Sequence, residues 1–236
     1  MSNGFQFIDI IFLAMVAVFL ALRLRNVLGR RDGHEGGYRD PFRPAPAPER
    51  RADSPANESD NVIRLPNRSE EVEAAERIAK AAHGDEKLAD GLTQIKLADP
   101  GFDPDTFVKG ARGAFEMILE AFAKGELGGI KSILSPEVFA NFEQAVKSRA
   151  EADETLENTL VGIRAAEVAE AYMDGRNAIV AVRFTSDQIN VTRDREGRVV
   201  SGDPSTVTAV VDLWTFQRDT RSRDPNWALV ATESVE

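Results

Sequence analysis

Alternating apolar and polar residues mark residues 177–231 as the one stretch of the chain that reads as continuous β-sheet. One predicted strand carries on a single face Ala178, Val180, Val182 and Phe184. A second strand has one face with Val207, Ala209, Val211 and Leu213 and another with Val210, Trp214 and Phe216. The polar residues 218–226 include a proline and an asparagine, and they predict a turn between two antiparallel strands. We therefore expect a curved antiparallel sheet with one face to be covered by helices.

The residues before this sheet have helical spacing. Asp103 followed by Pro104 predicts an N-cap and a first helical residue. From there to Gly125 runs the most strongly amphipathic stripe of the chain, made of Phe107, Ala111, Ala114, Phe115, Ile118, Leu119 and Phe122. This stripe predicts a long helix with one apolar face.

Shorter signals complete the predicted domain. Residues 127–134 predict a short second helix, and Ser135-Pro136 opens a third. A strand begins near Leu160, and residues 193–198 predict a hairpin turn. Helices followed by a run of antiparallel strands place the domain in the α+β class.

The N-terminal residues predict a membrane anchor. Within residues 5–24, the run from Phe7 to Leu22 is apolar except for Asp9, and Arg23 lies near its end; twenty helical residues reach roughly 30 Å, the thickness of a bilayer's hydrocarbon core. No Lys or Arg precedes the run and no small-x-small cleavage site follows it, which argues against a removed signal peptide. Arginines follow within residues 23–31, so the positive-inside rule predicts a cytoplasmic C-terminal domain. A removed signal and an interfacial helix are the alternatives to this single span.

Two segments of different character separate the predicted anchor from the domain. Residues 25–68 are rich in proline and glycine, and they predict a disordered linker or, as an alternative, a Pro-rich ligand for an aromatic groove. Residues 69–98 predict an amphipathic helical arm, which either packs loosely on the domain or detaches to meet a partner or the membrane. The domain proper is expected at residues 99–236.

Composition narrows the classes of function. The chain has no cysteine, which excludes disulfides and thiolate chemistry. Residues 67–236 contain 20 basic and 31 acidic side chains, so most of the domain surface should repel phosphate backbones, and no nucleic-acid partner is expected. Both histidines, His34 and His83, lie outside the expected domain. We predict no cofactor, no metal site and no catalytic residue.

Several fragments in a fixed order resemble a known family. They are Phe107-x-x-Gly110-Ala111-Arg112-x-Ala114-Phe115, Val182-Arg183-Phe184, Gly197-Arg198-Val199-Val200-x-Gly202-Asp203-Pro204, Asp212-x-Trp214-Thr215-Phe216-x-Arg218-Asp219 and Asp224-Pro225-Asn226-Trp227-x-Leu229. The set, over about residues 92–232, resembles the Tim44-like domain of the forty-four-kilodalton subunit of the mitochondrial inner-membrane translocase, and more closely its α-proteobacterial relatives. The resemblance implies a nuclear-transport-factor-like or cystatin-like sheet backed by helices, with a large apolar pocket.

The resemblance also carries expectations about partners. Family members tether a heat-shock chaperone to a protein-import channel and associate with membrane lipid. The mitochondrial protein has a transit peptide and a long charged segment for the chaperone and the channel, whereas this chain has the predicted anchor and a short Pro-rich linker. A bacterial relative with such an anchor would lie in the inner membrane.

Candidate site residues follow from the predicted concave face of the sheet. A ligand pocket could be lined by Phe115, Leu119, Phe122, Phe139, Phe142, Phe184, Trp214 and Phe216. The alternative is that these side chains fill the core. Arg112 and Arg183 could hold a carboxylate or a lipid phosphate at the pocket mouth, or could instead pair with an acid such as Asp212.

The sequence favours a membrane-anchored, non-enzymatic adaptor. It would bind membrane proteins, translocation or chaperone components, or inner-membrane lipid at the cytoplasmic face of the membrane. A carrier of lipid or another hydrophobic ligand is the first alternative. An isomerase-like enzyme is the second, because Asp212 shares a strand face with Trp214 and Phe216, where burial would raise its pKa.

Overall fold

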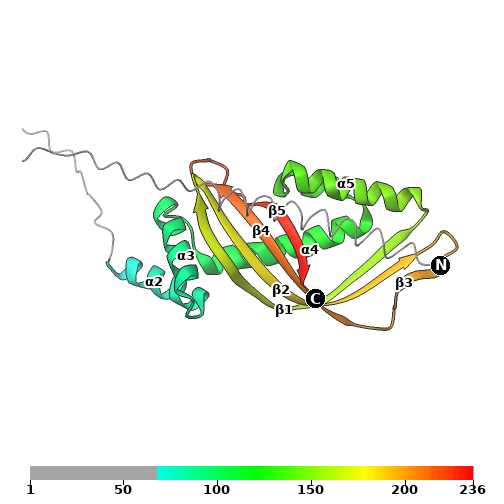
Figure 1. Ribbon diagram of the computed structural model, residues 1–236, viewed down its shortest axis with the longest axis horizontal. Helices are drawn as coiled ribbons and strands as arrows, with labels where there is room; N and C mark the ends of the chain where they lie inside the picture. The colour runs from blue at the N-terminus through cyan, green and yellow to red at the C-terminus, as the bar shows by residue number, and fades with distance from the viewer. Residues whose placement is uncertain (1–67, 236) are drawn as a thin grey trace, which may run out of the picture.

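The computed structural model describes residues 68–235, which form an α+β domain as predicted (Figure 1). The helices are α2 (Arg68–Ala82), α3 (Glu86–Ala98), α4 (Pro104–Lys124), the 3₁₀ helix η1 (Leu127–Ile133) and α5 (Pro136–Glu151). The strands are β1 (Thr155–Asp174), β2 (Asn177–Arg193), β3 (Val199–Gly202), β4 (Thr208–Asp219) and β5 (Ala228–Val235).

The strands form one antiparallel sheet in the order β1-β2-β4-β5, and β3 pairs with the end of β2 beyond β4. The β1–β2 pairing contains three register shifts, between Leu160 and Gly162, Ile163 and Ala165, and Val168 and Glu170. Such bulges bend a strand and increase its twist. They account for the strong curvature of β1 and β2 in Figure 1.

The apolar faces predicted for Ala178–Phe184 and for Trp214 with Phe216 are buried, although residues 179 and 181 on the other face of β2 are buried too. In β2 the residues Ala178, Val180, Val182 and Phe184 are almost completely buried. In β4, Trp214 and Phe216 are buried on the same side, and Val182 lies directly opposite Trp214 in the pairing. The predicted turn between residues 218 and 226 joins β4 to β5, which are antiparallel neighbours.

Helix α4 crosses the covered face of the sheet (Figure 1). It begins where predicted, because the carboxylate of Asp103 accepts a hydrogen bond from the backbone N–H of Thr106 at 2.8 Å and Pro104 is the first helical residue. It ends at Gly125, whose φ of 74° lies in the left-handed region that glycine adopts without strain. The stripe of Ala111, Phe115 and Ile118 is buried.

The segments that follow α4 connect it to the last strand. The predicted short helix after Gly125 is the 3₁₀ helix η1. Ser135 caps α5 by accepting a hydrogen bond from the N–H of Val138, and its own N–H donates to the carbonyl of Leu229 in β5 at 2.8 Å. Arg149, near the end of α5, donates hydrogen bonds to the carbonyls of Phe122 and Ala123 at the end of α4.

Helix α3 packs closely on β1. A Cβ atom placed on Gly91 would lie 1.9 Å from the carbonyl oxygen of Ala171, so the two backbones touch at a point where only glycine fits. Leu92 and Ile95 of α3 are fully buried in the core shared with the sheet. In α2, Ile78 is buried, and the guanidinium of Arg77 lies 3.0 Å from the carboxylate of Asp103.

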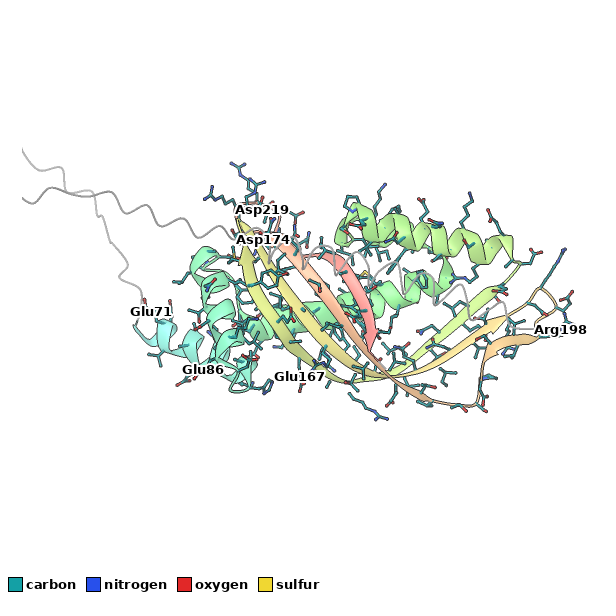
Figure 2. All side chains as sticks on the ribbon, viewed as in Figure 1. Glu71, Glu86, Glu167, Asp174, Arg198 and Asp219 are labelled. Carbon is teal, nitrogen blue, oxygen red and sulfur yellow. The ribbon has the colours of Figure 1, made fainter. Side chains whose placement is uncertain are left out.

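The predicted anchor at residues 5–24 lies outside the described residues, as does the predicted linker at 25–68 apart from its last residue, where α2 begins. Among residues 68–235, no helix combines the length and the apolar composition needed to cross a bilayer. The charged side chains of Glu71, Glu86 and Glu167 point away from the domain, in keeping with its acidic composition (Figure 2).

Candidate functional site

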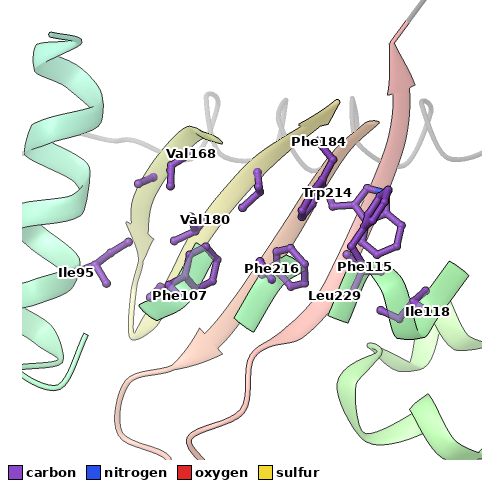
Figure 3. Close-up of a cluster of buried hydrophobic side chains, with 14 of the residues drawn as sticks. Ile95, Phe107, Phe115, Ile118, Val168, Val180, Phe184, Trp214, Phe216 and Leu229 are labelled. Atoms are coloured by element: carbon purple, nitrogen blue, oxygen red, sulfur yellow. The ribbon is translucent and has the colours of Figure 1, made fainter. Parts of the chain in front are cut away.

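Three of the aromatic side chains expected in a pocket pack against one another in the core (Figure 3). The ring of Phe115 stacks on Phe184 with centroids 4.4 Å apart, and it lies 4.6 Å from the ring of Trp214. All three side chains are buried. These three side chains therefore fill the core, which was the alternative to lining a pocket. The rings contact one another and leave no space between them for a ligand.

The other pocket candidates are divided between two places. Phe122 and Phe142 join α4 to α5 with ring centroids 4.9 Å apart, and Leu119 and Phe139 pack against the same core while partly exposed. Phe216, another of the eight candidates, lines an open groove. This groove lies between the start of α4 and the loop from β4 to β5.

We call this groove the aromatic groove. It has a volume of about 410 Å³ and is lined by Gly101, Phe102, Asp103, Thr106, Phe107, Gly110, Ala111, Ala114, Ile133, Phe216, Arg218, Pro225, Asn226 and Trp227. The ring of Trp227 lies 4.7 Å from Phe107 and 5.9 Å from Phe102, with interplanar angles of 62° and 52°. The volume of the groove lies in the range of ligand sites, and of its aromatic side chains Trp227 is partly exposed whereas Phe102, Phe107 and Phe216 are buried. A second hollow, of about 640 Å³, follows α5 alone and has a mostly polar lining, so we regard the aromatic groove as the better candidate.

Polar contacts hold the loop that forms one wall of the aromatic groove. The ammonium of Lys96 donates to the carbonyls of Pro100 and Phe102 at 2.7 and 2.8 Å. Arg218, at the end of β4, forms a largely buried ion pair with Asp99, and this pair ties the loop to the sheet. The groove wall is therefore held in place by α3 and β4 together.

A negative charge lies at the rim of the groove. Partial burial acts to raise the pKa of Asp103, but the hydrogen bonds from the hydroxyl and N–H of Thr106, together with the charges of Arg77 and Lys96, hold the pKa below its ordinary value. Asp103 therefore stays ionised at neutral pH. It serves at once as the cap of α4 and as the ion-pair partner of α2.

The two arginines proposed for a pocket mouth lie elsewhere. Arg112 donates a hydrogen bond of 2.7 Å to the carbonyl of Ile163 in β1, so it connects α4 to the sheet. Arg183 is exposed, and it alternates with the buried Val182 and Phe184 on the opposite face of β2. Neither arginine lines the aromatic groove.

Asp212 is buried on the covered face of the sheet, where its side chain accepts a hydrogen bond of 2.7 Å from the hydroxyl of Ser234. Burial raises the pKa of Asp212, and the hydrogen bond from Ser234 opposes that rise only partly. The nearby buried Ser186 and Gln188 bond to each other at 2.9 Å. Asp212 does not line the aromatic groove, so this carboxyl is separate from the candidate binding site.

The substitution Asp212→Asn is expected to raise the free energy of unfolding at pH 7 by about 1–2 kcal/mol. The wild-type carboxyl favours its proton more in the folded than in the unfolded chain, so wild-type stability falls as the pH rises above the ordinary carboxyl range. An asparagine has no proton to lose, and its amide oxygen can still accept from Ser234. The stability advantage of Asp212→Asn over the wild type should shrink below a pH of about 4, where the carboxyl of Asp212 is protonated in both the folded and the unfolded chain. Urea unfolding at several pH values measures this, and a variant less stable than wild type at pH 7 would contradict it.

Sequence reasoning missed most of the residues that line the aromatic groove. Arg218 and Asn226 belong to the turn predicted at residues 218–226, Trp227 falls in the stretch predicted as sheet, and no element is predicted at Phe102. Phe107 belongs to the apolar stripe of the predicted long helix. The available signal was the tryptophan placed directly after a turn, since a large apolar side chain in a loop must be covered or serve binding.

The family described as "Tim44-like domain" matches residues 88–234 of the chain. The protein belongs to this family. The resemblance drawn from the ordered fragments is confirmed, and the match runs from the first turn of α3 to the end of β5, one residue short of its last.

Similar proteins place this Tim44-like domain in context. A protein described as a probable mitochondrial import inner membrane translocase subunit of Caenorhabditis elegans is 25% identical over 76% of this chain and 42% of its own length. The chain thus spans less than half of that mitochondrial relative. An uncharacterized protein of Rickettsia prowazekii is 22% identical over 98% of this chain and 99% of its own length. Among solved structures, a candidate dehydratase of the NTF2-like family from Streptomyces avermitilis has a TM-score of 0.30 at 15% identity, covering 56% of this chain and 99% of that one.

Proposed function

We propose that the protein is a membrane-anchored, non-enzymatic adaptor whose Tim44-like domain binds membrane proteins at the cytoplasmic face of the inner membrane. The observation that carries the proposal is the aromatic groove in a domain whose mitochondrial relative is described as an import translocase subunit. Tryptophan is among the residue types that supply most binding energy at protein interfaces, and Trp227 is partly exposed in this groove. A role in protein translocation or in recruiting a chaperone rests on the family alone.

The predicted anchor and linker give this arrangement a physical purpose. A domain held at a membrane by a short tether meets membrane proteins at a high effective concentration, so weak contacts in the groove are sufficient. The strongly acidic composition of residues 67–236 argues against general attraction of the domain to anionic lipid surfaces. Protein partners are therefore favoured over a lipid surface as the occupants of the groove.

The test is site-specific crosslinking in intact membranes, which the absence of native cysteine makes clean. The full-length variant Asn226→Cys carries a photoreactive group at the rim of the groove, and Ser201→Cys carries it on the exposed strand β3 as a matched control. We expect discrete adducts with membrane proteins from position 226, at least tenfold above those from position 201. Equal labelling at both positions would contradict binding through the groove.

A carrier function is the first alternative, because a groove of about 410 Å³ is large enough for part of a lipid chain. Native mass spectrometry of the full-length protein would then show a retained apolar ligand, and adducts at position 226 would be with lipid. The isomerase alternative rests on the buried carboxyl of Asp212. It requires that Asp212→Asn abolish turnover of a substrate, whereas an adaptor with this variant should keep its crosslinks at position 226.

A further inference from the structure

Almost every carboxylate around the aromatic groove already has a cation as its partner. The groove is formed mainly by residues 99–110, which lead from α3 into α4, and residues 218–226, which lead from β4 towards β5. These two segments contain five carboxylates. Four of them form ion pairs, which are Asp99 with Arg218, Asp103 with Arg77, Asp105 with Lys80 and Asp219 with Arg176. The fifth, Asp224, accepts a hydrogen bond of 2.9 Å from the backbone N–H of Asn226.

Several cations around the groove, by contrast, form no ion pair with any of residues 68–235. They are Lys96, Lys109, Arg221 and Arg223. Arg221 and Arg223 are exposed on the loop whose two ends, at Arg218 and Asn226, line the groove. Figure 2 shows nitrogen-bearing side chains that extend into solvent beside the labelled Asp219. The groove is therefore bordered by positive charge that the described part of the chain does not neutralise.

This positive border is a local exception on the domain. Residues 67–236 contain 20 basic and 31 acidic side chains, which gives a net charge of −11. Most of the surface therefore repels an acidic protein segment, whereas the border of the groove attracts it, and such a contrast directs a partner to one site. Close to Arg223 in the chain, the partly exposed ring of Trp227 lies in a groove of about 410 Å³, where an apolar side chain can be covered.

We propose that the aromatic groove binds an acidic segment of a partner protein, with carboxylates on Arg221 and Arg223 and an apolar side chain against Trp227. The inference deepens the proposed function and rests on it, since it names the chemistry of the partner that the adaptor binds. Guanidinium groups hold carboxylates through two parallel hydrogen bonds, which fix orientation as well as charge. A narrow peptide reaches the groove alone, whereas an anionic membrane surface would also approach the acidic faces around it. The ion pair of Arg218 with Asp99 holds the base of the loop in place for this contact.

The experiment uses photocrosslinking from position 226 of the full-length protein in inside-out membrane vesicles. The test variant adds Arg221→Glu and Arg223→Glu to Asn226→Cys. The matched control adds Lys87→Glu and Arg195→Glu instead. These two cations are exposed, lie outside the groove segments and form no ion pair with residues 68–235, and their replacement changes the net charge equally. We expect the test variant to lose its adducts with membrane proteins at least tenfold, because attraction becomes repulsion, while the control keeps them.

The outcomes separate this inference from the adaptor function. Protein adducts that persist in the test variant would overturn the inference and leave the adaptor function standing, since that function is judged by position 226 against position 201 without the charge reversals. Equal labelling at those two positions would refute both. Mass spectrometry should map the attachment sites to partner segments rich in Asp and Glu. Attachment to neutral or basic segments would overturn the inference, and so would adducts with anionic phospholipid in place of protein.

A milder variant guards against a loss of folding. Replacing the same two residues by Arg221→Gln and Arg223→Gln removes the positive charge without adding repulsion, so its adduct yield should fall between those of the parent and the Glu variant. Urea unfolding should give all variants the stability of the parent, because neither guanidinium group bonds to another of residues 68–235. If the Glu variant unfolded, an undiminished yield from the folded Gln variant would still overturn the proposal.

Discussion

Replacing Phe115 with alanine is expected to lower the free energy of unfolding by about 3–5 kcal/mol. Phe115 is fully buried, stacks on Phe184 and contacts Trp214, so its removal leaves a cavity at the point where α4 meets the two central strands. The stiff rings around it belong to two β-strands and cannot move far to fill the space. A loss of this size is a large part of the total stability of a typical domain.

Urea unfolding followed by far-ultraviolet circular dichroism measures this change. Phe139→Ala is the matched control, since it removes the same side chain from a partly exposed position on α5 and should cost about 1 kcal/mol. If the two variants lost equal stability, the central position assigned to Phe115 would be wrong. A ligand pocket around Phe115 would also predict a smaller loss, because part of that space would already be empty.

Replacing Gly91 with alanine is expected to lower the free energy of unfolding by about 2–3 kcal/mol. In an ordinary helix this change stabilises by about 0.5–1 kcal/mol, because alanine has the higher helix propensity. Here the new methyl group would overlap the carbonyl oxygen of Ala171, and neither backbone can yield without moving α3 off β1. The sign of the effect is therefore reversed by a single contact.

Gly113→Ala in α4 is the matched control, because no atom lies within 4 Å of the position that its Cβ would occupy. It should stabilise the protein by about 0.5–1 kcal/mol. Both variants are compared by urea unfolding, with amide hydrogen exchange reporting on α3. The chain has two tryptophans, Trp214 in β4 and Trp227 just before β5. Because neither lies in α3, their fluorescence reports global unfolding and not the loss of α3 alone. A stabilising Gly91→Ala would show that α3 does not touch β1 in solution.

Helix α4 contributes side chains both to the aromatic groove and to the core. Phe107, in the first turns of α4, faces Trp227 and Phe216, while Phe115, two turns later, faces Phe184 and Trp214. The family assignment covers both regions. A variant that destabilises the core will therefore also weaken the groove, and tests of binding need substitutions at the rim, such as Asn226→Cys.

Local sequence patterns determined much of this fold on their own. The period-two alternation of β2 and β4, the Asp103-Pro104 start of α4, its stop at Gly125 and the Ser135 cap of α5 all follow from interactions between residues close in sequence. The ordered fragments were also sufficient to identify the family, because they combine turn residues with core positions.

Only the tertiary structure decided which aromatic side chains fill the core and which line a groove. Phe115 and Phe107 lie on one stripe of α4 with the same periodicity, and what distinguishes them is the partner that the sheet and the distant loop at residues 225–227 place opposite each. The same holds for Gly91, whose importance depends on Ala171 lying against it, and for Arg218, whose ion pair with Asp99 joins residues far apart in the chain. A one-dimensional pattern specifies that a side chain prefers burial, but the distances that decide what covers it arise when the chain closes on itself.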